Sequence, residues 1–467
     1  MRSGNFFCRE KTEKRIRQKN GFKTMEITKE EIIKRVRDAG VVGCGGAGFP
    51  THVKIAAAGR RAEVVIANGA ECEPLLKTDQ YLMLHKSREV VRGLQLVMAS
   101  SGASRGVVAL KSKYHEACAS LKKEVPPEIE VFEVGNFYPA GDEHVLVNEA
   151  TGRIVPEAGI PIAVGVIVDN VATLINVCEA VDKGLAVTRK YVTVTGEVKR
   201  PIIVKCAIGS RIRDVVKLAQ PIFENYVIVD GGAMMGEIAD EDEVVTKTTG
   251  AFIVLSNDSS VVAGKRRSIQ VSNRRAKSIC DQCMDCTLTC PRNLLGHRIY
   301  PHKIMRMNFF DCDEMNETTS GSFLCSQCGL CEITCPQGLS PKAVFKSVKE
   351  RLIKKGFKNI LQNADLKVHG EKDLRKFSAL RLIHRLGLAA LDRPASLYEK
   401  VFVPPRVRIP LLQHTGSPAK PVVIPGAQVK EGSLIAAIPE GKLGANIHSS
   451  ITGTVVKIDE KYIYIEQ

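Results

Sequence analysis

The chain has 467 residues, of which 44% are hydrophobic, so we expect three or four domains with packed cores. No stretch of about 18 uncharged apolar residues occurs, which excludes a transmembrane segment and predicts a soluble or at most peripheral protein. The net charge of +16 is concentrated in residues 1–24 and 342–408, and we interpret it as solvated or partner-docking surface; we expect no nucleic acid as a partner.

The N-terminal segment divides into a tail and a helix. Residues 1–24 hold 8 Lys/Arg against 2 Glu and predict a disordered basic leader, and Met25 is a candidate for the true start. Thr28 followed by Glu31 has the pattern of a capping box, and an apolar stripe at helical spacing comes next. Gly40 is typical of the position just beyond a helix, so we expect a short helix before residue 41.

A glycine-rich loop follows over residues 43–54, which read GCGGAGFPTHVK. Four glycines within six residues let the backbone approach a ligand closely. Lys54 falls where a helix should begin, and a helix N-terminus favours phosphate. On this evidence alone, a purely structural turn remains an alternative to a phosphate site.

The next stretch combines a buried strand with polar residues. Residues 63–67 (EVVIA) predict the strand, and residues 68–74 (NGAECEP) place Asn68, Glu71 and Glu73 directly after it. The carboxyl ends of strands are where α/β sheets bind ligands. We therefore expect these three side chains to belong to a binding site.

Two further motifs complete a recognisable set: residues 138–143 (YPAGDE) with Asn148, and residues 169–174 (DNVATL). With the two segments above they resemble the flavin-binding, NADH-oxidising subunit of respiratory complex I, in the order found in that family. The resemblance implies a Rossmann-like domain over residues 25–185 that binds FMN and NADH. It implies that FMN is held by Gly43, Gly45, Gly46, Gly48, Lys54, Asn68, Asn170 and Thr173.

The same resemblance places acids and one aromatic ring at the reacting end of the flavin. Glu71 would lie near the isoalloxazine ring with Glu73 and Glu143, the two candidate catalytic residues near the nicotinamide. Phe49 is a candidate to stack on the dinucleotide. The chain departs from the family pattern at four positions. Ala70 replaces an acid, Asp142 replaces Glu, Asp169 replaces Asn, and Cys44 stands where Arg is common.

Residues 186–268 have a different pattern. Strands are predicted at 191–195, 202–205 and 226–230, with a helix at 211–219 between the second and third. This β-β-α-β order resembles the soluble-ligand-binding β-grasp (SLBB) domain. The family name implies a ligand, but no charged cluster in the stretch indicates one, so a passive spacer is the alternative.

Two cysteine runs define a domain over residues 269–345. Both read C-x2-C-x2-C-x3-C-P, the spacing of bacterial ferredoxins with two [4Fe–4S] clusters, in which the fourth cysteine binds the partner cluster. Zinc sites and disulfide scaffolds fit less well, because zinc ribbons lack the third cysteine and disulfide scaffolds suit small secreted chains. We assign cluster 1 to Cys280, Cys283, Cys286 and Cys335, and cluster 2 to Cys325, Cys328, Cys331 and Cys290.

The C-terminal part is predicted as a connector and a small β domain. Residues 346–404 read as a basic helical connector, and residues 405–467 hold two similar strand-rich halves that resemble an RnfC-like barrel-sandwich hybrid domain. Carrier domains of this kind need a lysine at a hairpin tip, whereas the matching turn at 446–450 holds His448 and no lysine. We therefore expect a docking or structural module. The whole chain is then an α/β and α+β multidomain protein.

The order of these domains indicates electron transfer. NADH releases two electrons and an iron–sulfur cluster accepts one, so a flavin must stand between them. The order resembles the cobalamin reductases of propanediol-utilisation microcompartments, which implies an NADH-dependent oxidoreductase that reduces cobalamin. It also implies an adenosyltransferase and diol dehydratase system and shell proteins as partners, and the cytoplasm or the microcompartment lumen as location. The alternative is an electron-transfer component of an Rnf-type complex with a protein acceptor.

Overall fold

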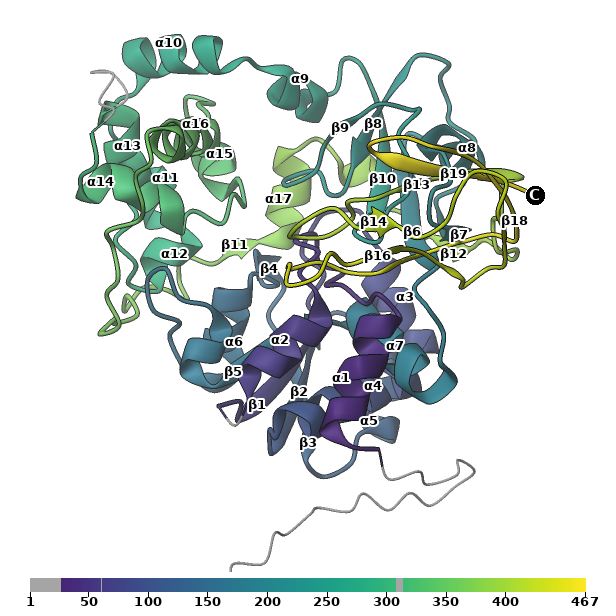
Figure 1. The fold of residues 1–467 in the computed structure, drawn as a ribbon. Coiled ribbons are helices and arrows are strands. Elements are labelled where there is room, and N and C mark those ends of the chain that lie inside the picture. Colours follow the sequence, from purple (N-terminus) through teal and green to yellow (C-terminus); the bar gives the residue numbers. More distant parts are fainter. Residues whose placement is uncertain (1–26, 60, 308–313) are drawn as a thin grey trace, which may run out of the picture.

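A parallel sheet forms the centre of the N-terminal domain (Figure 1). The computed structural model describes residues 27–59, 61–307 and 314–467; the predicted leader and Met25 lie outside this part. The strand order is β3-β2-β1-β5, a doubly wound arrangement that confirms the predicted Rossmann-like fold. The strands are β1 (Val64–Gly69), β2 (Arg105–Lys111), β3 (Ile129–Val134) and β5 (Val166–Asn170).

Helices cover both faces of this sheet because its central strands are apolar on both sides. The predicted first helix is confirmed: Thr28 Oγ1 accepts a hydrogen bond from the Glu31 N–H at 3.2 Å, and Gly40 has a φ of +66°. Six helices pack around one core and α6 covers the other face: α1 (Lys29–Asp38), α2 (Thr51–Ala58), α3 (Thr78–His85), α4 (Ser87–Ser101), α5 (His115–Glu124), α7 (Val171–Lys183) and α6 (Glu143–Thr151).

The second domain has the predicted β-β-α-β order. Its sheet runs β12-β7-β6-β10-β8-β9, and β6 pairs antiparallel with β7 and parallel with β10. The short strand β12 comes from the connector, so the two parts share one sheet. The elements are β6 (Arg189–Gly196), β7 (Ile202–Ala207), α8 (Ile212–Lys217), β8 (Tyr226–Asp230), β9 (Glu237–Ala239), β10 (Ala251–Ser256) and β12 (Ser396–Leu397).

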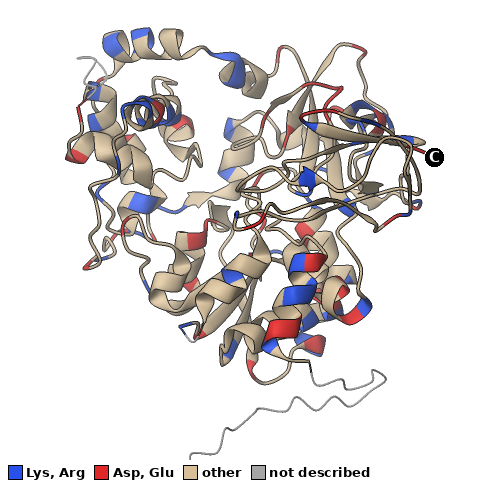
Figure 2. Ribbon diagram, viewed as in Figure 1, with Lys and Arg blue, Asp and Glu red and all other residues tan. Residues whose placement is uncertain are grey.

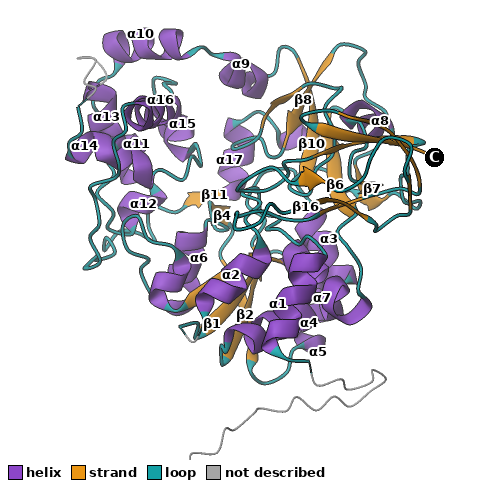
Figure 3. Cartoon of the chain, in the orientation of Figure 1, coloured by secondary structure: helices purple, strands orange, loops and turns teal. Residues whose placement is uncertain are grey.

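The cysteine-rich part is a group of short helices set apart from the sheets, as Figure 3 shows. Lysines and arginines are frequent on α10 and α16 (Figure 2). Among the described residues, no helix has the length and apolar character needed to cross a bilayer. Helix α9 (Ser260–Arg266) still belongs to the second domain and packs against β9. The helices of the cysteine-rich part are α10 (Ile269–Ile279), α11 (Asp285–Leu288), α12 (Pro291–Leu294), α13 (Pro301–Met307), α14 (Glu317–Ser320), α15 (Leu330–Thr334) and α16 (Pro341–Lys354).

The connector is only partly helical, in contrast to the prediction for residues 346–404. After α16 the chain is irregular until β11 (Phe377–Ser378), which pairs with β4 (Phe137–Tyr138) of the first domain. Helix α17 (Ala379–Arg385) follows. The irregular stretch is rich in Lys and lacks an apolar period, so it has no apolar helix face to bury and is held by contacts with other domains.

Two small sheets form the C-terminal domain. One has the order β13-β19-β18-β15 and the other β14-β16-β17, around a core that includes Ile435, Val455 and Ile463. The turn with His448 is buried against the β-grasp domain, where Ser450 Oγ donates to the Ile208 carbonyl. The strands are β13 (Arg406–Pro410), β14 (Lys420–Pro421), β15 (Gln428–Val429), β16 (Leu434–Ala437), β17 (Ile447–His448), β18 (Gly453–Ile458) and β19 (Tyr462–Glu466).

Candidate functional site

The glycine-rich loop precedes α2 and presents free backbone donors. The Gly43 N–H donates to the Phe49 carbonyl at 2.9 Å and closes the loop. Gly46 has a φ of +105°, and a Cβ on it would meet no atom within 4 Å, so the surface there is open. The N–H groups at positions 45–47 donate to no acceptor in the described part of the chain. Such a loop fits a phosphate group.

The four motifs converge at the carboxyl edge of β1 and β5. Asn68 and Asn170 are register partners on these adjacent strands. Asn170 Nδ2 donates to Asp79 Oδ2 at 2.7 Å, and Asn68 Nδ2 donates to the Gly141 carbonyl at 2.9 Å. Thr173, on the first turn of α7, accepts the Cys44 N–H at 2.9 Å and joins the glycine loop to this edge. The structure therefore brings the sequence-predicted residues together around one edge.

Lys54 and Asp169 form an ion pair beneath this edge. Lys54 Nζ lies 2.9 Å from Asp169 Oδ1 and also donates to the Val168 carbonyl at 2.8 Å. Burial acts to lower the pKa of Lys54, but the Asp169 carboxylate overcomes this effect and raises it. The Asp169 side chain is 0% exposed, and its Oδ2 has no partner among the described residues. The departure from the family's Asn at this position thus supplies a carboxylate that holds Lys54.

Several carboxylates gather beside the ion pair. Burial, and then the nearby Asp79 and Glu73, raise the pKa of Glu71 well above its usual value. Burial also raises the pKa of Asp79 to about 6. Desolvation raises the pKa of Glu143 although its side chain reaches solvent, with Lys54 acting in the opposite direction. Clustered acids with raised pKa values are common at sites that bind and react with ligands.

Glu73, predicted as catalytic, has both carboxylate oxygens engaged. It accepts the N–H groups of Met234 and Met235, each at 2.9 Å, from the turn after β8. Met234 in turn accepts a hydrogen bond from Lys342 Nζ at 2.8 Å through its carbonyl. Glu73 therefore fastens the first domain to the β-grasp and cysteine-rich domains, and its role at the nicotinamide stays a prediction.

The eight run cysteines surround two separate cavities, four at each. Each group mixes three cysteines of one run with the fourth of the other, as predicted. No three His, Cys, Asp or Glu side chains in the described ranges converge closely enough to hold a single metal ion, and a cubane needs its thiolates spread more widely than one ion does. The groups are Cys280, Cys283, Cys286 and Cys335 at one cavity, and Cys290, Cys325, Cys328 and Cys331 at the other.

The two cysteine loops have matching backbones. Gln282 and Met284 have φ values of +59° and +71°, and Gln327 and Gly329 have +61° and +77° at the corresponding positions. These left-handed residues turn the backbone around each cavity. The residues before each fourth cysteine, Thr289 and Thr334, also meet, with their Oγ1 atoms 3.1 Å apart. The pair of loops is thus shaped for two clusters and not for two zinc knuckles.

The second cysteine group lies directly against the flavin motifs. Tyr138 Oη donates to the Cys328 carbonyl at 2.6 Å. Asp142 Oδ2 lies 3.0 Å from Arg292 Nη2, and both side chains are largely buried. Burial acts to raise the pKa of Asp142, but the Arg292 guanidinium outweighs it and the pKa is lowered. By contrast, Cys283 of the first group is exposed at the surface.

Sequence reasoning missed the contacts that hold the glycine loop from outside the first domain. Thr415 donates to the Gly48 carbonyl at 3.0 Å through its N–H and to the Ala47 carbonyl at 2.6 Å through its hydroxyl. Lys247 Nζ, fully buried, donates to the Gly40 carbonyl at 2.7 Å and the Asn446 carbonyl at 2.6 Å. These partners are about 200 or more positions apart in the chain, so no local sequence pattern predicts the contacts.

Comparison with known proteins agrees with this geometry. Three family models match: a Nuo51 FMN-binding domain over residues 36–179, a 4Fe–4S dicluster domain over residues 279–340 and an RnfC barrel-sandwich hybrid domain over residues 395–467. The fold and the two kinds of site therefore define an oxidoreductase that transfers electrons with FMN and two [4Fe–4S] clusters.

Relatives along the whole chain identify the family. The cobalamin reductase PduS of Salmonella typhimurium is 38% identical over 447 residues, 94% of this chain and 97% of the relative. PduS of Citrobacter freundii is 37% identical over 442 residues, 93% and 96% of the two chains. One component of the proton-translocating ferredoxin:NAD(+) oxidoreductase complex of Clostridium ljungdahlii is 33% identical over 273 residues, 58% of this chain and 57% of that one. The chain belongs to the family of PduS cobalamin reductases.

Proposed function

We propose that this protein takes electrons from NADH and delivers them to the cobalt of a cobalamin. The observation that supports this proposal best is the attachment of the flavin motifs to the second cysteine group through Tyr138 and the Asp142–Arg292 pair. Full-length similarity to proteins named cobalamin reductases supports the choice of substrate. Delivery to an adenosyltransferase and diol dehydratase system inside a microcompartment, with shell proteins as neighbours, belongs to the same proposal.

Different residues of the flavin edge would bind different parts of FMN. The open N–H groups of the glycine loop suit its phosphate, and the cation of Lys54 adds a charge beneath them. Asn68, Asn170 and Thr173 keep the edge in register through the bonds described above. When bound, the flavin supplies the conversion of a two-electron donor into one-electron transfers. The proposed cofactor-binding set, in which Phe49 would stack on the dinucleotide and the others would hold or adjoin FMN, is Gly43, Gly45, Gly46, Gly48, Phe49, Lys54, Asn68, Glu71, Asn170 and Thr173.

The cysteine groups would hold one cluster each and differ in position. Cys290, Cys325, Cys328 and Cys331 lie beside the flavin motifs, whereas the other group includes the exposed Cys283. An external acceptor therefore approaches most readily at the first group. Glu143 lies at the solvent side of the flavin edge, where a carboxylate with a raised pKa can hold a proton near the donor.

A second candidate function is transfer to a protein acceptor. The similarity to a component of an ion-translocating complex, together with the RnfC-type C-terminal domain, favours it. In that case the exposed cysteine group would face a partner protein and cobalamin would not be reduced. The two functions share all steps up to the first cysteine group, so the acceptor distinguishes them.

An anaerobic assay separates these alternatives. Purified protein with its cofactors would be mixed with NADH and cob(II)alamin, and visible spectra would be recorded with an alkylating agent present to trap cob(I)alamin. Formation of alkylated cobalamin together with NADH oxidation supports the proposal. Bleaching of the protein's chromophores with no change in the corrinoid contradicts it and favours a protein acceptor.

A further inference from the structure

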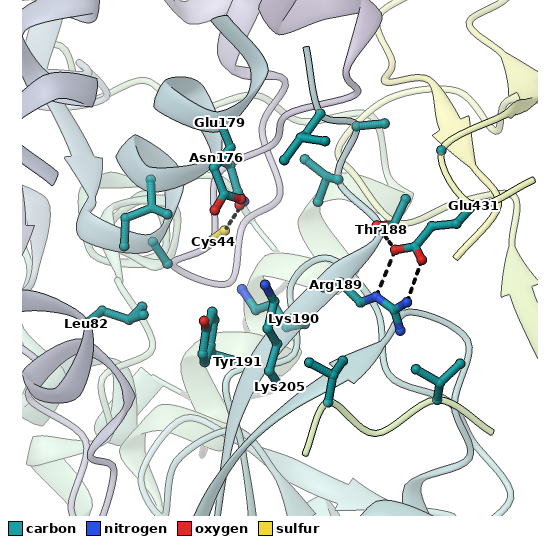
Figure 4. A pocket seen from close by; sticks show the side chains of 18 residues that line it. Cys44, Leu82, Asn176, Glu179, Thr188, Arg189, Lys190, Tyr191, Lys205 and Glu431 are labelled. Carbon is teal, nitrogen blue, oxygen red and sulfur yellow. Dashed lines mark hydrogen bonds and ion pairs between the residues drawn. The ribbon is translucent and has the colours of Figure 1, made fainter. Parts of the chain in front are cut away.

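A cavity of about 480 Å³ lies beside the flavin edge (Figure 4). It is formed where α7 of the first domain, strands β6 and β7 of the β-grasp domain, and the turn at Glu431–Gly432 of the C-terminal domain meet. Cavities of this size are typical of small-molecule sites. Its walls come from three domains, so it exists only in the assembled chain.

Not every cationic side chain on the cavity walls forms an ion pair with a carboxylate. Arg189 is neutralised by Glu431, with Nη2 2.6 Å from Oε2 and Nε 2.9 Å from Oε1. Glu179 lies 3.8 Å from Lys86. The ammonium groups of Lys190 and Lys205 form no ion pair with any residue that the structure describes. Two ammonium groups on the cavity wall therefore have no carboxylate within 4.0 Å among the described residues.

Lys190 is a largely buried residue on the cavity wall. It is 6% exposed, and its side chain borders the cavity in Figure 4. The charge of Lys190 acts to lower the pKa values of Asp79 and Asp230, but neither carboxylate lies within 4.0 Å of the Lys190 ammonium. An anionic ligand in the cavity would therefore give the Lys190 ammonium a direct ion-pair partner. Burial lowers the pKa of Lys205; the carboxylates of Glu179 and Glu431 act in the opposite direction, and the nearby cations Lys86 and Arg189 add to the lowering.

Much of the rest of the lining is apolar, with one aromatic ring and a few polar side chains such as Asn176 and Thr188. The aromatic ring is that of Tyr191, and Lys205 Nζ lies 5.4 Å from its centroid. Leu82 and Ile175 complete the wall next to them. Two cations beside an aromatic and aliphatic surface match a ligand that joins a phosphate to a planar ring, as a nucleotide does.

The cavity also adjoins the flavin edge. Cys44 lies on its wall, its N–H donates to Thr173 Oγ1, and its Sγ accepts from Asn176 Nδ2 at 3.5 Å. Helix α7 begins with the proposed flavin residues and presents Asn176 and Glu179 to the cavity one and two turns later. A ligand in the cavity would therefore lie next to the glycine loop.

We propose that this cavity binds the phosphate-bearing nucleotide part of a ligand of the reaction, with Lys190 and Lys205 at the phosphate. The inference rests on the proposed function, which brings two such ligands to the protein. NADH contains a diphosphate that joins two nucleosides, and cobalamin contains a phosphodiester in its nucleotide arm. A complete corrinoid exceeds the cavity, so only that arm would enter it.

Binding to the oxidised holoprotein tests the proposal without any electron transfer. Isothermal titration would compare NAD⁺, hydroxocobalamin and cobinamide, which lacks the nucleotide arm. The variants are Lys190→Met and Lys205→Met, and Lys217→Met on the outside of the same domain is the control for loss of one charge. FMN and iron contents equal to wild type would show that a variant is assembled. We expect about tenfold weaker binding of one phosphate-bearing ligand in both cavity variants.

Each outcome has a definite meaning. Weaker binding of hydroxocobalamin but not of cobinamide identifies the corrinoid arm, and weaker binding of NAD⁺ alone identifies the dinucleotide. Unchanged affinities for all three ligands in assembled Lys190→Met and Lys205→Met proteins overturn the proposal. Cobalamin reduction by the wild type is measured separately, so a failure of the proposed function would be seen even where the cavity binds a nucleotide.

Discussion

The Tyr138 hydroxyl donates a 2.6 Å hydrogen bond to the carbonyl oxygen of Cys328, and so links a flavin motif to a cysteine loop 190 positions away. Tyr138 is 1% exposed, and β4, in which it lies, pairs with β11 of the connector. The bond fixes the flavin edge relative to the second cysteine group. Electron transfer depends steeply on such spacing, so the contact is a natural target for mutation.

Replacement of Tyr138 by Phe tests this link. We expect wild-type FMN and iron contents, a loss of about 1 kcal/mol in stability, and slower bleaching of the clusters by NADH. Stopped-flow spectra under anaerobic conditions measure the rate. Tyr464→Phe, which removes a 2.8 Å bond to Asp459 in the C-terminal domain, is the matched control. Equal bleaching rates in both variants would show that the Tyr138 bond does not position the two sites.

The Lys54–Asp169 pair gives a prediction about FMN. Lys54→Met leaves a buried carboxylate without its cation, so we expect a loss of up to about 3 kcal/mol in stability together with loss of FMN. Adding Asp169→Asn removes the stranded charge and should restore stability but not FMN. Thermal unfolding and FMN released from the purified proteins provide the two readouts. A double variant with full FMN content would exclude Lys54 from the flavin site.

Because each cluster takes its fourth cysteine from the other run, replacing a fourth cysteine should damage the cluster of the opposite run. Cys290→Ala should damage the cluster of Cys325, Cys328 and Cys331, and Cys335→Ala the cluster of the other run. Iron analysis and EPR spectra of the reduced proteins, which distinguish the two clusters, measure the losses. If Cys290→Ala instead removed the cluster of its own run, the assignment would be wrong.

His448 gives a prediction about pH. Burial lowers its pKa to about 3, whereas an unfolded histidine titrates near 6.5. Between these values the unfolded chain binds a proton that the folded chain does not, so the contribution of His448 to stability falls as the pH drops below about 6.5. Wild-type protein should therefore lose up to about 2 kcal/mol more than His448→Gln between pH 7 and pH 5. Thermal unfolding at both pH values measures the difference, and parallel shifts would contradict the assignment.

Motifs with local spacing could be predicted from the sequence, and contacts between distant segments could not. The spacing within each cysteine run identifies three ligands of one group, and the ferredoxin pattern assigns the fourth to the other run. The flavin motifs can be recognised by their composition and order. Glu73 shows the limit: its motif indicates a ligand site, yet the Met234–Met235 turn that it holds is distant in sequence. Lys190 and Lys205 likewise look like ordinary strand residues until three domains enclose them.

The most direct measurement is a single-turnover reaction of NADH with cob(II)alamin and a trapping alkylating agent, run on wild type and on Cys290→Ala. One NADH gives up two electrons and each cobalt takes one, so the account predicts two alkylated cobalamins per NADH in the wild type. It predicts little or none in the variant, where the second cysteine group is broken. Equal yields and rates in the two proteins would show that electrons reach cobalamin without that group, and would contradict the account.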